Sequence, residues 1–127
     1  MELEFLNLEE PCSVPYSDAV CVDGKTLYLS GLVSEDLVTG ELVTGDITVQ
    51  TRQVLQNLAQ LLERFGSDMN HVIRVEVVLT DYALSGEMNA EYVRHFDAAR
   101  RPSRICCGGA ELYEGCLVEM MAIAVKK

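Results

Sequence analysis

The chain has 127 residues, of which 49% are hydrophobic, and a formal net charge of −10. This length suits one domain with its own core, and we treat residues 1–127 as that single domain. The ten Lys and Arg residues are scattered apart from one cluster, Arg100, Arg101 and Arg104. Such an acidic chain lacks the concentrated positive charge that nucleic acids require, so general RNA or DNA binding is disfavoured.

No segment has the pattern of a targeting signal or of a membrane-spanning sequence. The acidic N-terminal residues MELEFLNLEE lack the basic-then-apolar pattern of a secretion signal. The longest apolar stretch, residues 117–125, contains Glu119 and is far shorter than a membrane span. We therefore expect a cytoplasmic protein that does not bind a membrane.

The first half of the chain predicts a hairpin, a long loop and a helix. In "AVCVDGKTLYLSG", two short apolar runs flank Asp23-Gly24, a pair that accepts the positive φ angles of a tight turn. The polar segment "VSEDLVTGELVTGD" predicts a long loop that ends at Asp46, a helix-capping residue. Apolar residues then recur at helical spacing from Ile47 to Phe65, and Gly66 ends this helix.

The second half predicts a strand, a shorter helix and a closing hairpin. "VIRVEVVLTD" alternates in the manner of a strand, and residues from about 85 to 96 place Met88, Tyr92 and Phe96 on one helical stripe. Residues 105–110 and 117–125 are expected to pair as a hairpin around Tyr113-Glu114-Gly115. The order predicts an α+β fold: a sheet with two helices on one face.

The last predicted strand has apolar residues on both of its faces. Two helices can cover only one face of a sheet, and no further element remains to shield the other. Another copy of the chain is the economical cover, so the sequence predicts a homo-oligomer.

Glu119 and Arg104 are the first candidates for chemistry. A lone carboxylate in an apolar strand costs several kcal/mol, so Glu119 is either paired to an arginine for register or docking, or lies in a pocket to handle a proton or a water. Arg104 is either an exposed strand-end charge or, beside Glu119 in the closing hairpin, a bidentate clamp for a carboxylate.

The five cysteines predict neither a disulfide nor a metal site. They are odd in number with no C-x-x-C spacing, and the adjacent pair Cys106-Cys107 would strain a bridge between its members. His71 and His95 are isolated, so zinc is not expected. We interpret the thiols as reduced, mostly buried packing residues, although arginines nearby could activate Cys106 or Cys107.

Several motifs, in order along nearly the whole chain, are similar to those of the Rid (YjgF-type) reactive-intermediate deaminases. They are VPYSDAV from residue 14, Ser30-Gly31, Thr39-Gly40-Glu41, Gly45-Asp46, Gln50-Thr51-Arg52, RVEVVLTD, MNAEYVRHF and RPSRICCGGAELYEGCLVEMMAIAV. The last of these resembles the family signature. The resemblance implies a chorismate-mutase-like mixed sheet, a homotrimer whose sheets form a central barrel, and three clefts between subunits.

The resemblance also assigns roles by position. Arg104 matches the arginine that grips the substrate carboxylate, and Glu119 matches the glutamate that holds a water. Cys106 and Gly31 match residues that make backbone contacts, and residues matching Tyr16, Ser30 and Asn89 line the cleft. The implied reaction is hydrolysis of small 2-imino or enamine acids, products of pyridoxal-phosphate enzymes, to 2-keto acids and ammonia, with Tyr16 as a proton partner and no cofactor or metal.

Some positions depart from the family pattern, and two alternative functions stay open. The departures are Val14, Leu32, Ile105, Cys107-Gly108-Gly109 and Met121, which alter the expected cleft wall and leave the preferred substrate side chain undetermined. The same cleft could bind a keto acid or another small carboxylate without turnover. Endoribonuclease or translation-inhibitor activity, a label attached to this family, is disfavoured by the acidic charge.

Overall fold

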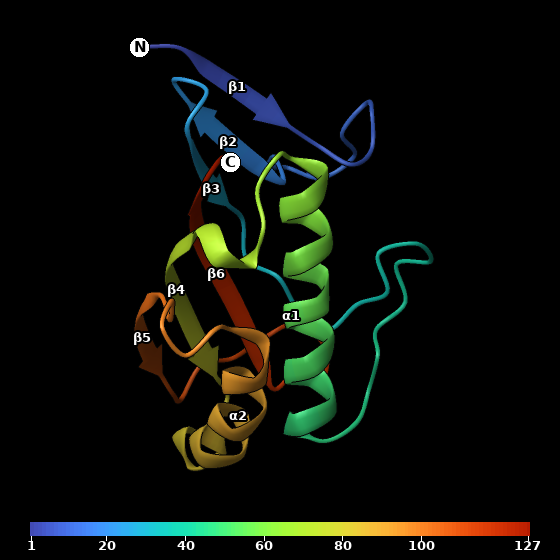
Figure 1. The fold of residues 1–127 in the computed structure, drawn as a ribbon. Coiled ribbons are helices and arrows are strands. Elements are labelled where there is room, and N and C mark those ends of the chain that lie inside the picture. The colour runs from blue at the N-terminus through green and yellow to red at the C-terminus, as the bar shows by residue number, and fades with distance from the viewer.

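A computed structural model describes residues 1–127 as one mixed sheet with two α-helices (Figure 1). The strands are β1 (Leu3–Leu6), β2 (Ala19–Val22), β3 (Thr26–Leu29), β4 (Val72–Leu79), β5 (Ser103–Cys107) and β6 (Val118–Val125). The helices are α1 (Ile47–Arg64) and α2 (Ser85–Tyr92), with 3-10 turns at Met69–His71, Tyr82–Leu84 and Val93–His95. The sheet order is β1-β2-β3-β6-β4-β5, and only β4 and β5 are parallel. The expected α+β class is confirmed.

Local signals in the first half of the chain have the predicted effects. Asp23 and Gly24 adopt φ angles of 53° and 65° in the turn between β2 and β3. The Asp46 carboxylate accepts a hydrogen bond of 2.9 Å from the backbone N–H of Val49, which caps α1. Gly66 has a φ of 89° directly beyond the last turn of that helix.

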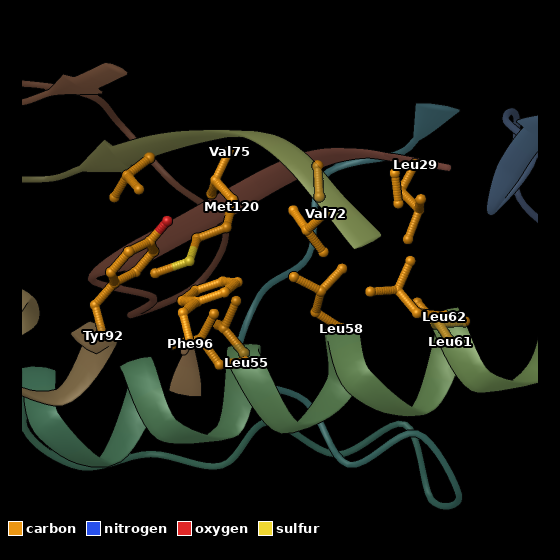
Figure 2. Close-up of a cluster of buried hydrophobic side chains, with 14 of the residues drawn as sticks. Leu29, Leu55, Leu58, Leu61, Leu62, Val72, Val75, Tyr92, Phe96 and Met120 are labelled. Carbon is orange, nitrogen blue, oxygen red and sulfur yellow. The ribbon is translucent and has the colours of Figure 1, made fainter. Parts of the chain in front are cut away.

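Both helices pack on the same face of the sheet, and 22 buried residues form the core between them (Figure 2). Leu55, Leu58 and Leu62 on α1 point toward the strands, as their helical spacing predicts. The stripe containing Tyr92 and Phe96 lies against the same core. The two rings are 4.8 Å apart between centroids.

The opposite face of the sheet has no cover within the chain. Along β6, Val118, Met120, Ala122 and Ala124 are buried, whereas the residues between them are partly exposed. Tyr28 on β3 and Ile105 on β5 are each 48% exposed. The two-sided apolar character of β6 therefore corresponds to one face packed on helices and one open face.

The predicted closing hairpin is wrong. β5 pairs with β4 in parallel, and β6 lies between β3 and β4. The segment between β4 and β5 contains α2, and a crossover of this length is what a parallel pair requires. A strand that is apolar on both faces takes a central position, and this excludes β6 from a hairpin at the edge next to β5.

Strand β1 has no counterpart in the sequence-based prediction. Leu3 and Phe5 point to the same side as Val20 and Val22 of β2, and both are largely exposed. The acidic composition of the first ten residues concealed a four-residue edge strand whose apolar side chains belong to the open face.

Gly108 is required where the end of β5 meets the turn after β4. A Cβ added there would lie 2.6 Å from the backbone nitrogen of Tyr82, closer than packed atoms allow. Gly109, next in the chain, has a φ of 78°. Glycine at position 108 therefore permits this close approach of two backbone segments.

We expect Gly108→Ala to lower the free energy of unfolding by about 1–3 kcal/mol, because the methyl group overlaps rigid backbone. Gly86→Ala is the matched control, since a Cβ there meets no atom within 4 Å and the residue lies in α2. Gly86→Ala should raise the free energy of unfolding by about 0.5–1 kcal/mol, because alanine has a higher helix propensity than glycine. Urea unfolding of the two variants measures the contrast, and equal stabilities would contradict it.

Candidate functional site

Four of the predicted site residues, Tyr16, Ser30, Gly31 and Glu119, line one groove of about 890 Å³. We call it the glutamate groove. Its wall also contains Glu35, Glu41 and Glu114, so it is strongly acidic. Burial, and then the nearby charge of Asp18, raise the pKa of Glu35. No sequence pattern indicated Glu35 as a residue of this groove, because it lies in a long loop whose path could not be predicted.

Ser30 fixes one wall of the glutamate groove. Its hydroxyl donates a hydrogen bond of 2.6 Å to the Ser17 carbonyl, and its backbone N–H donates one of 3.0 Å to the Asp18 carbonyl. These bonds tie the end of β3 to the loop that carries Tyr16, which is 54% exposed. The proton of the Ser30 hydroxyl is therefore engaged in holding this loop.

Gly31 and Glu119 meet because the strand pairing continues past the end of β3. Leu32 and Met120 exchange two backbone hydrogen bonds of 2.7 and 3.0 Å, which bring Gly31 against β6. A Cβ on Gly31 would overlap the Glu119 carboxylate, so only glycine leaves that carboxylate in place. No Lys or Arg of the chain forms an ion pair with Glu119, so an arginine that pairs with it for strand register is not observed.

The other predicted site residues, Asn89, Arg104 and Cys106, lie on α2 and β5. Together with Tyr92, which was not predicted as a site residue, we call them the arginine cluster. The guanidinium carbon of Arg104 lies 4.7 Å from the centroid of the Tyr92 ring, a cation–π distance. Arg104 is half-buried, and no carboxylate or carbonyl of the chain accepts a hydrogen bond from it.

Two buried polar atoms without partners lie on α2, one of them on the tyrosine beneath this guanidinium. The Tyr92 hydroxyl and the side-chain carbonyl of Asn89, one helical turn earlier, have no hydrogen-bond partner. Burial raises the pKa of Tyr92 to about 12, against the opposing charge of Arg104. Burial also raises the pKa of the Cys106 thiol despite Arg104, so this cysteine stays a neutral thiol and packs rather than acting as a nucleophile.

The remaining cysteines agree only in part with the prediction. All five are free thiols, as expected. Cys21 and Cys116 are buried, but Cys12 and Cys107 are exposed, so the expectation of mostly buried thiols is wrong for these two. Cys107 is exposed because alternate residues of the edge strand β5 face the uncovered side of the sheet.

The expected proximity of Arg104 and Glu119 is wrong within one chain, because β4 separates their strands. Val75 of β4 pairs with both Arg104 and Ala122, whereas Val78 pairs with Glu119. Side chains alternate between faces along a strand, so Arg104 lies on the helix-covered face and Glu119 on the open face. The lining of the glutamate groove includes no member of the arginine cluster.

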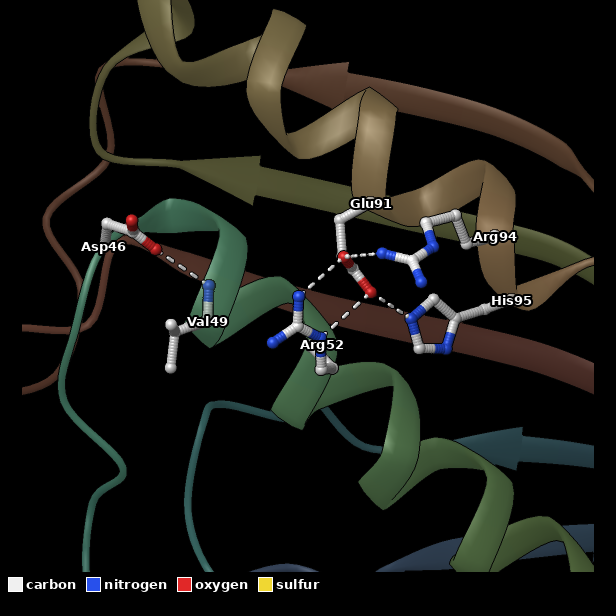
Figure 3. Close-up of polar contacts among 6 residues, drawn as sticks. All are labelled: Asp46, Val49, Arg52, Glu91, Arg94 and His95. Carbon is white, nitrogen blue, oxygen red and sulfur yellow. Dashed lines mark hydrogen bonds and ion pairs between the residues drawn. The ribbon is translucent and has the colours of Figure 1, made fainter.

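An ion-pair network fixes the helix that carries Asn89 and Tyr92 (Figure 3). The Glu91 carboxylate is 3.1 Å from Arg52 on α1, 3.5 Å from Arg94 and 2.7 Å from His95. Its side chain is only 3% exposed. Burial raises the pKa of Glu91, but the hydrogen bonds and charges of Arg52 and His95 outweigh burial and hold the pKa below its usual range.

Sequence reasoning placed Tyr92 in the core and assigned it no role beside Arg104. The helical stripe containing Tyr92 is typical of core packing, and core packing is also what its ring does. The contact with Arg104 depends on the parallel pairing of β5 with β4, which no local pattern in the sequence revealed.

The fold is an α+β sheet with one polar group on each of its faces, and known proteins share this architecture. A solved structure from Yersinia pestis, described as a protein of unknown function of the conserved Rid protein family, superposes with a TM-score of 0.88 at 32% identity, covering 98% of this chain and 99% of that one. The family model described as endoribonuclease L-PSP matches residues 8–126. The chain belongs to this family, the Rid or YjgF family.

Curated relatives in the family carry different names. A RutC family protein of Pyrococcus horikoshii is 40% identical over 89% of this chain and 88% of its own length. The 2-iminobutanoate/2-iminopropanoate deaminase of Mus musculus is 39% identical over 88% of this chain and 82% of its own. The resemblance read from the sequence motifs is thus confirmed at the level of the family.

Neither helix of the fold combines the length and apolar character needed to cross a bilayer.

Glu91→Gln should reduce the free energy of unfolding at neutral pH by about 2 kcal/mol, because Arg52 and His95 lose a buried anionic partner. The lowered pKa of Glu91 means that its stabilisation is present above the unfolded carboxyl pKa of about 4 and is lost as the pH falls through the folded value. Urea unfolding across pH measures the difference. Glu87→Gln, at an exposed position on the same helix, should change little at any pH.

Proposed function

We propose that this chain hydrolyses small 2-imino acids to 2-keto acids and ammonia, and that Arg104 binds the substrate carboxylate. The observation that carries the proposal is a half-buried guanidinium, fixed over Tyr92, with no acceptor in a chain that has 20 acidic and 10 basic residues. Arginine forks bind carboxylates through paired charge-assisted hydrogen bonds. The name of the mouse relative, 2-iminobutanoate/2-iminopropanoate deaminase, supports this class of substrate.

We propose further that the complete site forms between subunits of a homotrimer whose sheets build a central barrel. Arg104 and Glu119 lie on opposite faces of their own sheet, so they can flank one substrate only if they come from different copies. The open face, with Tyr28 and Ile105 exposed, supplies apolar area for such an assembly. In this arrangement the arginine cluster of one subunit faces the glutamate groove of the next.

Charge fixes the orientation of the substrate in this composite cleft. The carboxylates around Glu119 repel a substrate carboxylate, whereas Arg104 attracts it. The imine nitrogen therefore points to the acidic side, where negative charge stabilises its protonated form. Protonation makes the imine carbon more electrophilic, which favours attack by water.

Glu119 orients the attacking water and accepts its proton. The water oxygen bonds to the carbon of the protonated imine as Glu119 takes its proton, and the electrons of the C=N π bond move to nitrogen to give a neutral carbinolamine. Glu119 then returns the proton to the amino group, which makes it a leaving group. Loss of a proton from the carbinolamine hydroxyl then restores a carbonyl as the C–N bond breaks and ammonia leaves, with Tyr16 as the second proton partner in the groove. Positioned acid–base groups contribute about 10²–10⁴-fold, which suffices for a bond that also hydrolyses spontaneously.

Two other functions predict different results. A protein that only binds keto acids would use the same Arg104 contact without releasing ammonia. Ribonuclease activity, suggested by the family description, would require phosphate backbone to approach Glu35, Glu41 and Glu114, and this repulsion disfavours it.

An imine-hydrolysis assay supplied by a threonine dehydratase tests the proposal. Arg104→Ala should lower kcat/KM for 2-iminobutanoate by about 10²-fold or more, because two charge-assisted hydrogen bonds are lost. Arg101→Ala, an exposed neighbour with the same change in charge, is the control and should behave as wild type. Equal rates for wild type and Arg104→Ala would overturn the proposal, and ligand binding with only spontaneous ammonia release would favour the binding function.

Mixing two inactive variants tests whether the site is shared between subunits. Arg104→Ala and Glu119→Gln should each be inactive alone. Co-expressed in equal amounts, they should recover about one quarter of wild-type activity, because half of the subunits supply an intact arginine and half of their neighbours an intact glutamate. A mixture as inactive as its components, or a wild-type protein that sediments as a monomer, would contradict the shared site.

A further inference from the structure

Tyr92 stands in an unusual position in the arginine cluster. It is 4% exposed, its ring lies beneath the Arg104 guanidinium, and the ring of Phe96 supports it from the core. Figure 2 shows its hydroxyl directed toward the strands rather than into the helix layer. Such a hydroxyl normally has an acceptor for its proton when it is buried, and this one has none in the chain.

The ring limits where the guanidinium can lie. Arg104 is on an edge strand, where a long side chain would otherwise sample many rotamers. An aromatic face 4.7 Å away favours one orientation of the planar fork, and the core contacts of Tyr92 make that face rigid. A guanidinium that is already held in one orientation loses less conformational entropy when an anion binds to it.

The hydroxyl needs an acceptor that the protein does not provide. Arg104 has only donors, so it can donate to the hydroxyl oxygen of Tyr92 but cannot accept the hydroxyl proton. A carboxylate bound to the fork brings several acceptor positions to the same place. Because burial raises the pKa of Tyr92 to about 12, its hydroxyl keeps its proton and can donate it in a hydrogen bond at any physiological pH.

We propose that Tyr92 is a positioning and recognition residue of the carboxylate site: its ring holds the Arg104 guanidinium, and its hydroxyl donates to the same ligand carboxylate. This inference rests on the proposed function, in which Arg104 binds the substrate carboxylate. It assigns the selection of an anionic over a neutral ligand to an aromatic residue of α2 as well as to the arginine.

The experiment compares two ligands that differ only in charge at the relevant end. NMR titration gives Kd for 2-oxobutanoate and for its neutral amide, 2-oxobutanamide, and the ratio of the two values measures carboxylate selectivity. We expect Tyr92→Phe to lower this selectivity about tenfold through loss of one charge-assisted hydrogen bond, and Tyr92→Leu to lower it further. Binding of the amide should change little, whereas a merely structural defect would weaken both ligands alike.

Tyr82→Phe is the matched control, because it removes the same hydroxyl from a tyrosine that is 59% exposed and lies outside the arginine cluster. It should keep wild-type selectivity. Wild-type selectivity in Tyr92→Leu would overturn the inference alone, and wild-type selectivity in Tyr92→Phe would overturn the hydroxyl contact. Absence of selectivity in the wild-type protein would instead overturn the proposed function, and this inference with it.

If Tyr92→Leu does not fold, the selectivities of Tyr92→Phe and Tyr92→His test the positioning role of the ring instead. The imidazole keeps a planar ring at this position but alters the face presented to the cation, so Tyr92→His should be less selective than Tyr92→Phe. Equal selectivity of Tyr92→His and wild type would overturn the positioning role.

Discussion

The position of β6 in the middle of the sheet is the constraint on which the rest of the molecule depends. Its neighbours β3 and β4 satisfy its backbone on both sides, so its side chains divide strictly between two faces. The residues from Val118 to Ala124 that face the helices complete the core. The intervening residues, Glu119 among them, are assigned to the face that this chain leaves uncovered.

This division explains how an apolar strand tolerates a carboxylate. Glu119 is the first residue of β6 whose side chain faces outward. It lies beside Gly31, which has no side chain. The helix-facing residues carry the packing, and the outward positions are free to carry chemistry. Arg104 lies on the opposite face of the sheet. Helix α2 covers that face and provides the Tyr92 ring as a surface for the guanidinium.

Local features of the fold could be predicted from the sequence, and the strand pairing could not. The hairpin at Asp23, the cap at Asp46 and the stripe of α1 depend on neighbours within a few residues, and all were confirmed. Whether β5 pairs with β4 or β6 depends on long-range burial, which the two apolar runs alone do not reveal. The wrong pairing also placed Arg104 beside Glu119, although only Glu119 lines the glutamate groove.

A net charge of −10 opposes the association of this chain with copies of itself, yet its charges are distributed in a way that permits it. On the open face, Arg74 lies 3.7 Å from Glu76, so this pair adds little net charge to a mostly apolar surface. Four carboxylates without an ion-pair partner, Glu35, Glu41, Glu114 and Glu119, line the glutamate groove, where a neighbour's Arg104 would meet them. Electrostatic attraction would then act at the proposed cleft while apolar burial acts across the sheet, so one arrangement of subunits would satisfy both.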